Sequence, residues 1–171
     1  MISKEQFRIS AADSVHCSRQ APLKLVVVIG IEQVVFSVVL VVQNNLNVLE
    51  SLFEPRWVVM GYCFGGLVAL DLARAGADIK GAVSFHGFLS GPEEDSTREI
   101  KAKLVVLHGH LDPMVGEDQI SSFISEMSEK KVDWQIHNFG DAMHSFTNPQ
   151  ANDPDFGTVY SKNADKRSWK I

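Results

Sequence analysis

Three side chains that together can perform nucleophilic catalysis occur along this sequence in the order cysteine, aspartate, histidine. Cys63 lies in the hexapeptide GYCFGG at residues 61–66, Asp112 lies in HLDP, and His144 lies in MHSF. A thiolate can attack a carbonyl carbon, an imidazole can take up and return a proton, and a carboxylate can hold the imidazole in the required tautomer. The same chain order is typical of enzymes whose nucleophile sits on a sharp strand-to-helix turn.

The hexapeptide has the small residues that such a turn, a nucleophile elbow, requires. The elbow strains the backbone of its central residue, and large side chains two positions away would collide, which explains Gly61 and Gly65. A helix beginning just after Cys63 would favour the thiolate, and the backbone N–H of Phe64 would face a developing oxyanion. The alternative is that Cys63 is a small buried hydrophobe, the commoner role of a free cysteine. The hexapeptide and the chain order favour the nucleophile.

Asp112 and His144 also have simpler interpretations. Asp112 precedes Pro113 and could serve only a turn, and Asp141, three residues before His144, is a rival carboxylate. His144 could bond only the backbone of its loop. We predict Asp112 as the acid and His144 as the base. The remaining histidines do not show the close spacing of a helical metal site, so we expect no metal and no cofactor.

The flanking sequence predicts strands that alternate with helices. Short apolar runs predict the strands, and helical patterns lie between them. The expected strands span residues 56–60, 80–85, 103–108 and 132–137, and the expected helices span residues 65–75, 116–131 and 164–170. This alternation indicates an α/β fold with a parallel sheet. Because ligands bind at the carboxyl ends of such strands, we expect Cys63, Asp112 and His144 to project from one edge.

A strongly apolar stretch, residues 23–42, precedes this region. Its length approaches that of a membrane-spanning helix, but Glu32 and Gln33 lie near its middle, where a charge is unfavourable. Its many valines favour strands. We therefore predict two buried strands separated near residues 30–33 rather than a membrane segment.

Composition narrows the class of protein. The chain has 171 residues, 45% of them hydrophobic, which suits one domain with a sizeable core. Its net charge of −5 and the lack of a basic cluster argue against a nucleic-acid partner. Two cysteines, Cys17 and Cys63, are too few for a disulfide framework, so we expect a reducing, cytoplasmic location.

From about residue 58 onward the sequence resembles the dienelactone hydrolase (carboxymethylenebutenolidase) family. The resemblance is carried by GYCFGG, GAVSFHG, KAKLVVLHGHLDP and HSFTNPQA…ADKRSW. It implies an α/β-hydrolase-type fold, a mostly parallel sheet flanked by helices. It also implies that Cys63 is the nucleophile, Asp112 the acid and His144 the base, in the hydrolysis of a small-molecule ester or enol-lactone through a thioester.

The first third of the chain departs from the family pattern. We expect a single domain over residues 1–171, with 1–55 divergent or shortened and 56–171 forming the catalytic part. The early region of the family supplies a second oxyanion donor and a glutamate that pairs with the nucleophile, and Glu32 is the candidate for the latter. Family members that cleave dienelactone have an arginine four residues after the catalytic histidine, where this chain has Asn148; Arg167 is a candidate replacement. A different ester or lactone is therefore expected.

Other residues are predicted to line the substrate pocket. Besides Glu32 and Asn148, these are Tyr62, His86 and Phe146. We keep two alternatives to a working hydrolase: a catalytically impaired remnant that acts as a binding or structural domain, and a thiol sensor based on Cys63. The sequence does not indicate an oligomeric state.

Overall fold

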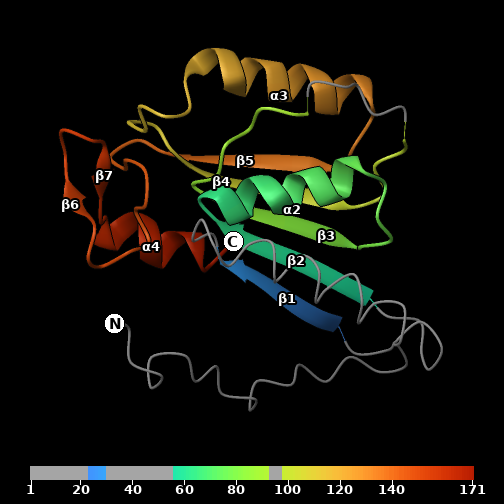
Figure 1. The fold of residues 1–171 in the computed structure, drawn as a ribbon, viewed down its shortest axis with the longest axis horizontal. Helices are drawn as coiled ribbons and strands as arrows, with labels where there is room; N and C mark the ends of the chain where they lie inside the picture. The colour runs from blue at the N-terminus through green and yellow to red at the C-terminus, as the bar shows by residue number, and fades with distance from the viewer. Residues whose placement is uncertain (1–22, 30–55, 93–97) are drawn as a thin grey trace.

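The computed structural model describes residues 23–29, 56–92 and 98–171 of the chain. Five strands in these ranges form one sheet in which every neighbouring pair is parallel (Figure 1). Their order across the sheet is their order along the chain: β1 (Leu23–Ile29), β2 (Arg56–Tyr62), β3 (Gly81–Phe85), β4 (Lys103–Gly109) and β5 (Trp134–Phe139). The carboxyl ends of β2, β4 and β5 therefore lie along the same edge, which is where the candidate site forms.

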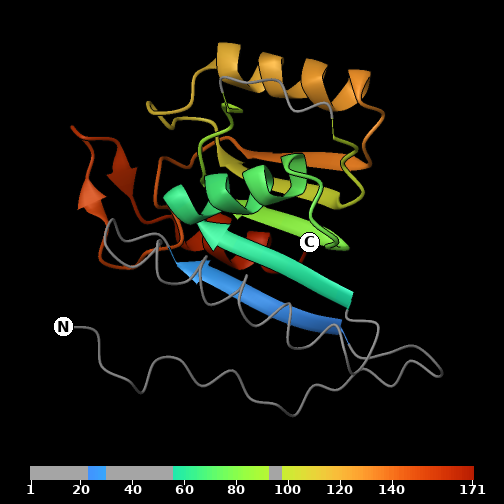
Figure 2. The ribbon, with the colours of Figure 1, turned by 45° about the vertical axis from the view of Figure 1, so that its right-hand side comes forward.

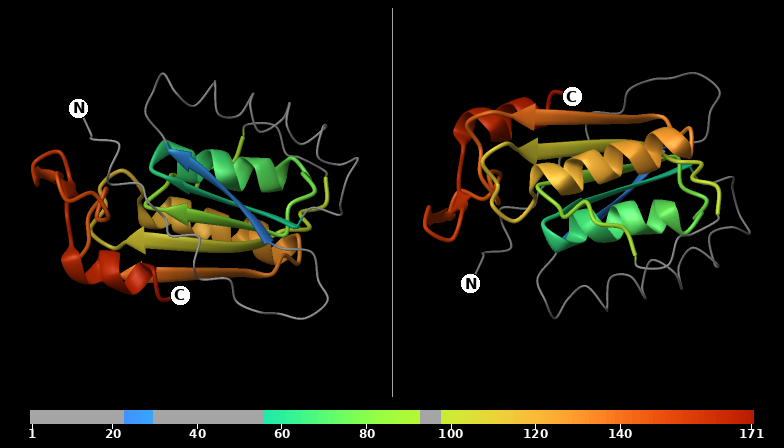
Figure 3. Two further views of the ribbon diagram at one scale, coloured as in Figure 1. Left: turned by 90° about the horizontal axis from the view of Figure 1, so that it is seen from below. Right: turned by 90° about the horizontal axis from the view of Figure 1, so that it is seen from above.

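Three helices among the described residues cover the two faces of this sheet. α2 (Phe64–Arg74) and α3 (Glu117–Glu129) lie on one face, and α4 (Lys162–Ser168) lies on the other (Figure 3). α2 is rich in alanine and leucine and is followed by Gly76, whose φ of 73° suits the left-handed turn that ends many helices. α4 is capped at its N-terminus by Ser161, whose hydroxyl accepts a hydrogen bond from the backbone N–H of Ala164 at 3.3 Å.

Each face of the sheet has its own apolar core, as the alternation of side chains along strands requires. The core under α2 and α3 contains Val59, Ala82, Leu104 and Val106 from the strands, together with Ala69, Leu70, Ala73, Phe123 and Met127 from the helices. The core on the α4 face contains Met60, Phe85, Leu107, Phe139, Ala142, Phe146 and Ala164. The strands that carry the site are thus held by packing on both sides.

A buried guanidinium joins α2 to α3. Arg74 is 1% exposed and makes ion pairs of 2.9 Å with both Asp71 and Glu126. It also donates to the backbone carbonyls of Leu89, at 2.9 Å, and Ser90, at 3.5 Å. Multiple hydrogen bonds of this kind are what allow a charge to stay buried. They fix the loop after β3 against both helices.

The sequence predicted most of these elements. The expected strands and helices from residue 56 onward all occur, with ends shifted by up to about two residues, as helix and strand boundaries generally are. The first expected strand within residues 23–42 is β1, which lies beside β2 (Figure 2); residues 30–42, where the second was expected, lie outside the described residues. Within the described ranges, no helix has the length and apolar character needed to cross a membrane.

One small element was not predicted from the sequence. β6 (Asn152–Asp153) and β7 (Thr158–Val159) form a two-stranded antiparallel hairpin in the loop between β5 and α4. Each strand has only two residues, too few for a periodic pattern to be recognised in the sequence. The hairpin matters because its second strand pairs with the backbone of His144.

Candidate active site

Cys63 occupies the tight turn between β2 and α2, as the hexapeptide predicted. Its φ of 54° and ψ of −122° are unusual for a residue with a side chain, and such strain is common at functional positions. The turn is fixed by a hydrogen bond of 3.0 Å from the backbone N–H of Cys63 to the carbonyl of Phe85. A Cβ atom at Gly61 would overlap the backbone of Gly65, which explains the glycine at that position.

Glycine is also needed where the chain leaves β3 beside the elbow. A Cβ atom at Gly87 would lie 2.9 Å from both the carbonyl oxygen of Cys63 and the Cα atom of Gly66. The hydroxyl of Ser84, which is fully buried, occupies the space beside the same two glycines. This close packing of backbone on backbone keeps the elbow against the end of β3.

The structure brings Cys63, His144 and Asp112 into one chain of contacts. His144 Nε2 lies 3.1 Å from Cys63 Sγ, and His144 Nδ1 lies 2.8 Å from Asp112 Oδ2. The other carboxylate oxygen of Asp112 accepts a hydrogen bond of 2.8 Å from the backbone N–H of Met114. Both carboxylate oxygens are therefore engaged, and the imidazole is held in one orientation with Nε2 facing the sulfur.

The backbone of His144 is held by the hairpin. Its N–H donates to the carbonyl of Gly157 at 3.0 Å, and its carbonyl accepts from the N–H of Val159 at 3.1 Å. The following residue, Ser145, has a φ of 57°, a second strained position at this edge. His144 is thus fixed at its main chain as well as at its ring.

The electrostatics of the site favour a thiolate beside an imidazolium. The hydrogen bond with His144 lowers the pKa of the Cys63 thiol, and burial raises it. The charge of His144 and the backbone N–H of Phe64 lower it further. Burial alone would lower the pKa of His144, but its bonds with Asp112 and Cys63 raise it to about 9. His144 is therefore protonated at neutral pH.

The rival carboxylate does not take the place of Asp112. Asp141 is exposed, and the carboxylate that bonds His144 is that of Asp112. Phe64, the residue after Cys63, is 44% exposed. Tyr62 is half-buried and its ring stacks on Phe85 with centroids 4.7 Å apart, so it points into the packing between strands.

The remaining predicted residues differ in their relation to the site. His86 is buried with its ring centroid 5.2 Å from that of His144. Phe146 is completely buried in the core on the α4 face. Asn148 is exposed, and its side-chain oxygen accepts from the backbone N–H of Gln150 at 3.0 Å. Glu32, and any second oxyanion donor from the early loop, lie outside the described residues.

Two contacts near the base were not predicted from the sequence. The half-buried ring of Phe88 lies 6.0 Å from that of His144, and the hydroxyl of Thr147 lies 2.8 Å from Nε2 of His86. Thr147 follows His144 by three residues and lies within the family-like stretch HSFTNPQA, which is the one signal that could have drawn attention to it.

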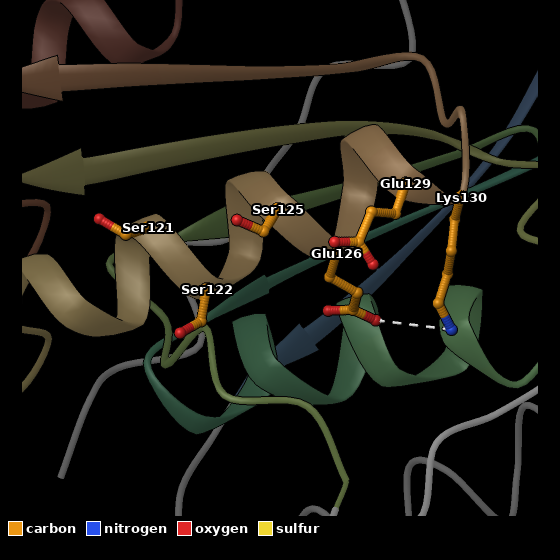
Figure 4. Close-up of a pocket in the computed structure, with 6 residues that line it drawn as sticks. All are labelled: Ser121, Ser122, Ser125, Glu126, Glu129 and Lys130. Atoms are coloured by element: carbon orange, nitrogen blue, oxygen red, sulfur yellow. Dashed lines mark ion pairs between the residues drawn. The ribbon is translucent and has the colours of Figure 1, made fainter.

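A hollow on α3 lies apart from Cys63, His144 and Asp112. No cluster of three or more His, Cys, Asp or Glu side chains among the described residues has an arrangement suited to a metal ion. A hollow of about 500 Å³ lies on α3 (Figure 4). It is lined by Ser121, Ser122, Ser125, Glu126, Glu129 and Lys130 and includes none of the three residues of the contact chain. Its charges are partly compensated, since Lys130 lies 4.0 Å from Glu126.

A parallel sheet with helices on both faces, and a tight strand-to-helix turn at its carboxyl edge, define an α/β hydrolase fold. The sequence matches the dienelactone hydrolase family over residues 20–171, and the chain belongs to that family. The match begins well before residue 58, so the resemblance reaches further toward the N-terminus than the motifs in the sequence indicated.

Individual relatives agree with this assignment. An uncharacterized protein of Caenorhabditis elegans is 40% identical over 131 residues, which are 74% of this chain and 82% of the relative. The solved structure of m3DLH is 34% identical, with a TM-score of 0.68, over 78% of this chain and 56% of that one. The solved structure of a dienelactone hydrolase-like promiscuous phosphotriesterase from metagenomic libraries is 36% identical, with a TM-score of 0.64, over 75% of this chain and 55% of that one. The chain thus spans just over half the length of these two solved structures.

Proposed function

We propose that this member of the family hydrolyses an ester or an enol-lactone, with Cys63 as nucleophile, His144 as acid and base, and Asp112 as the residue that orients His144. The observation that carries the proposal is the unbroken line of contacts from Cys63 Sγ through His144 to Asp112, with distances of 3.1 Å and 2.8 Å. A structural cysteine would not need an imidazole aligned in this way.

The reaction would begin from the thiolate–imidazolium pair. The thiolate attacks the substrate carbonyl carbon, and the backbone N–H of Phe64 donates to the oxyanion that forms. As the tetrahedral intermediate collapses, the carbon–oxygen bond of the ester breaks and the leaving oxygen takes the proton from His144 Nε2. A thioester on Cys63 and a neutral His144 remain.

The second half of the reaction restores the resting state. Neutral His144 removes a proton from a water molecule, whose oxygen attacks the thioester carbonyl carbon. When this second intermediate collapses, the carbon–sulfur bond breaks, the acid is released and Cys63 returns as a thiolate beside a protonated His144. Asp112 keeps its charge throughout and stabilises the imidazolium.

The surroundings of the sulfur support an uncharged substrate. Among the described residues, the charged groups that act on the Cys63 thiol are His144 and Asp112. The neighbouring side chains are apolar: Phe64 follows Cys63 in the chain and is exposed, and the half-buried ring of Phe88 lies 6.0 Å from that of His144. Asn148 stands in place of the family arginine, so that position has no positive charge to bind a substrate carboxylate. A neutral ester or lactone fits these surroundings better than a charged one.

A burst assay tests the proposal. With p-nitrophenyl acetate, the wild-type chain should release a burst of p-nitrophenolate equal to the protein concentration, followed by steady turnover. Cys63→Ala should reduce turnover by at least about a thousandfold. Turnover that survives this substitution unchanged would remove Cys63 from the mechanism.

The same assay separates the alternatives. A catalytically impaired domain would have a thiol that is alkylated normally, but it would show neither the burst nor the turnover. A thiol sensor would instead form a reversible sulfenate on Cys63 in dilute peroxide.

A further inference from the structure

A second histidine, His86, is packed against the imidazole of His144. His86 directly follows β3, is 3% exposed and has a φ of 38°, which is uncommon for a residue with a side chain. Its backbone N–H donates to the carbonyl of Leu107 at 2.8 Å, and the residue before it, Phe85, accepts from the N–H of Cys63. The backbone of His86 is therefore tied to β4 and lies one residue from the anchor of the elbow.

The side chain of His86 contacts the loop that carries His144 at three points. Its ring lies edge-on to the ring of His144, with centroids 5.2 Å apart and an interplanar angle of 65°. It is also edge-on to Phe146 at 5.2 Å and 80°. Its Nε2 lies 2.8 Å from the hydroxyl of Thr147. One buried side chain thus spans three of the four residues 144–147, a segment whose backbone is strained at Ser145.

His86 is suited to stand beside a positive charge because it stays neutral. Burial, followed by the charge of His144, lowers the pKa of His86 to about 3, although a polar contact with its own backbone and the charge of Asp112 act in the opposite direction. The other titratable group whose ring faces it is Tyr62, at 6.0 Å, whose pKa is raised to about 12 by burial and by Asp165. An uncharged aromatic ring can pack on the imidazolium of His144 without repelling it.

The second ring nitrogen of His86 strengthens the case for a role beyond packing. Its Nδ1 is buried and has no hydrogen-bond partner among the described residues. Leaving such an atom unpaired is unfavourable, so an apolar side chain of similar shape would be the more stable choice for packing alone. What a histidine adds here is the hydrogen bond with Thr147.

We propose that His86 is a positioning residue that keeps the imidazole of His144 in line between Cys63 and Asp112, through its ring contact and its bond to Thr147. The catalytic consequence of this inference rests on the proposed function, because both concern the same site. Its structural content, the alignment of His144 with the sulfur, can be measured without any substrate.

The test measures the rate of Cys63 alkylation by iodoacetamide as a function of pH. We expect His86→Asn, which tolerates a positive φ but lacks the ring, to raise the pH of half-maximal alkylation by about one unit, because the contact between Cys63 and His144 is loosened. Thr147→Val should shift it in the same direction, and Thr147→Ser, which keeps the hydroxyl, should restore the wild-type profile. His137→Asn, a matched change on β5, should leave the profile unchanged.

Steady-state kinetics supply a second readout. In His86→Asn we expect kcat for p-nitrophenyl acetate to fall roughly a hundredfold, the effect of a small misplacement of a catalytic group, with little change in KM. Wild-type alkylation and kinetics in a folded His86→Asn protein would overturn the inference. If that variant does not fold, identical profiles for Thr147→Val and Thr147→Ser would overturn it equally. Absence of ester turnover in the wild type would defeat the proposed function alone, since the alkylation profiles would still decide the role of His86.

Discussion

His144 Nδ1 and Asp112 Oδ2 lie 2.8 Å apart, and the two side chains are 2% and 0% exposed. A hydrogen bond between groups so well shielded from water is strongly directional, since water does not compete for either partner. The pair also determines which nitrogen of His144 is presented to Cys63, because the proton on Nδ1 is committed to the carboxylate.

Replacing Asp112 by Asn should therefore disable the site while leaving its shape unchanged. Without the carboxylate charge, the pKa of His144 falls, and the amide can favour the wrong tautomer. We expect kcat/KM for p-nitrophenyl acetate to fall on the order of a thousandfold. Asp141→Asn, at the exposed rival carboxylate, is the matched control and should retain full activity. The reverse pattern would assign the acid to Asp141.

The opposite pKa shifts of Cys63 and His144 predict a specific difference between two pH profiles. Alkylation of Cys63 needs only the thiolate, so its rate should reach a plateau at a lower pH than for a free thiol and remain there at higher pH, because the thiol pKa is lowered. Ester turnover also needs the proton on His144, so it should fall again above about pH 9. Parallel profiles for the two reactions would show that His144 does not deliver a proton to the leaving group.

Gly61 should be far less tolerant of a methyl group than Gly140. A Cβ atom at Gly61 would overlap the carbonyl of Gly65, which belongs to the backbone of α2 and cannot move without displacing the helix, whereas a Cβ atom at Gly140 meets nothing within 4 Å. We expect Gly61→Ala to lower the free energy of unfolding by about 2 to 3 kcal/mol. Gly140→Ala should stay within about 0.5 kcal/mol of the wild type. Urea denaturation measures both, and equal stabilities would contradict the tight packing of the elbow.

Local patterns explain why so much of this molecule is predictable from its sequence. The hexapeptide around Cys63 combines the end of a strand, two glycines and the start of a helix within a few residues, so the turn can be recognised from neighbouring residue types alone. Apolar runs likewise locate the central strands, because strands buried on both faces leave a continuous signal. The resemblance to a family then indicates which of two nearby carboxylates faces His144.

The features that were not predicted depend on contacts between residues far apart in the chain. Nothing in the types of His86 and Thr147 indicates that residues 61 positions apart share a hydrogen bond. The hairpin that holds His144 is too short to produce a pattern in the sequence. Such features need the tertiary fold, because they arise only when loops from different strands meet.

The agreement between strand order in space and strand order in the chain has a consequence for synthesis on the ribosome. Each described strand, as it emerges, finds the preceding one already present as an edge to join, so the sheet can grow from one side without rearrangement. The hairpin that holds the main chain of His144 is synthesised after the described strands of the sheet. Until the hairpin forms, this hold on His144 is missing, so the nascent chain should carry a thiol that still lacks its imidazole partner.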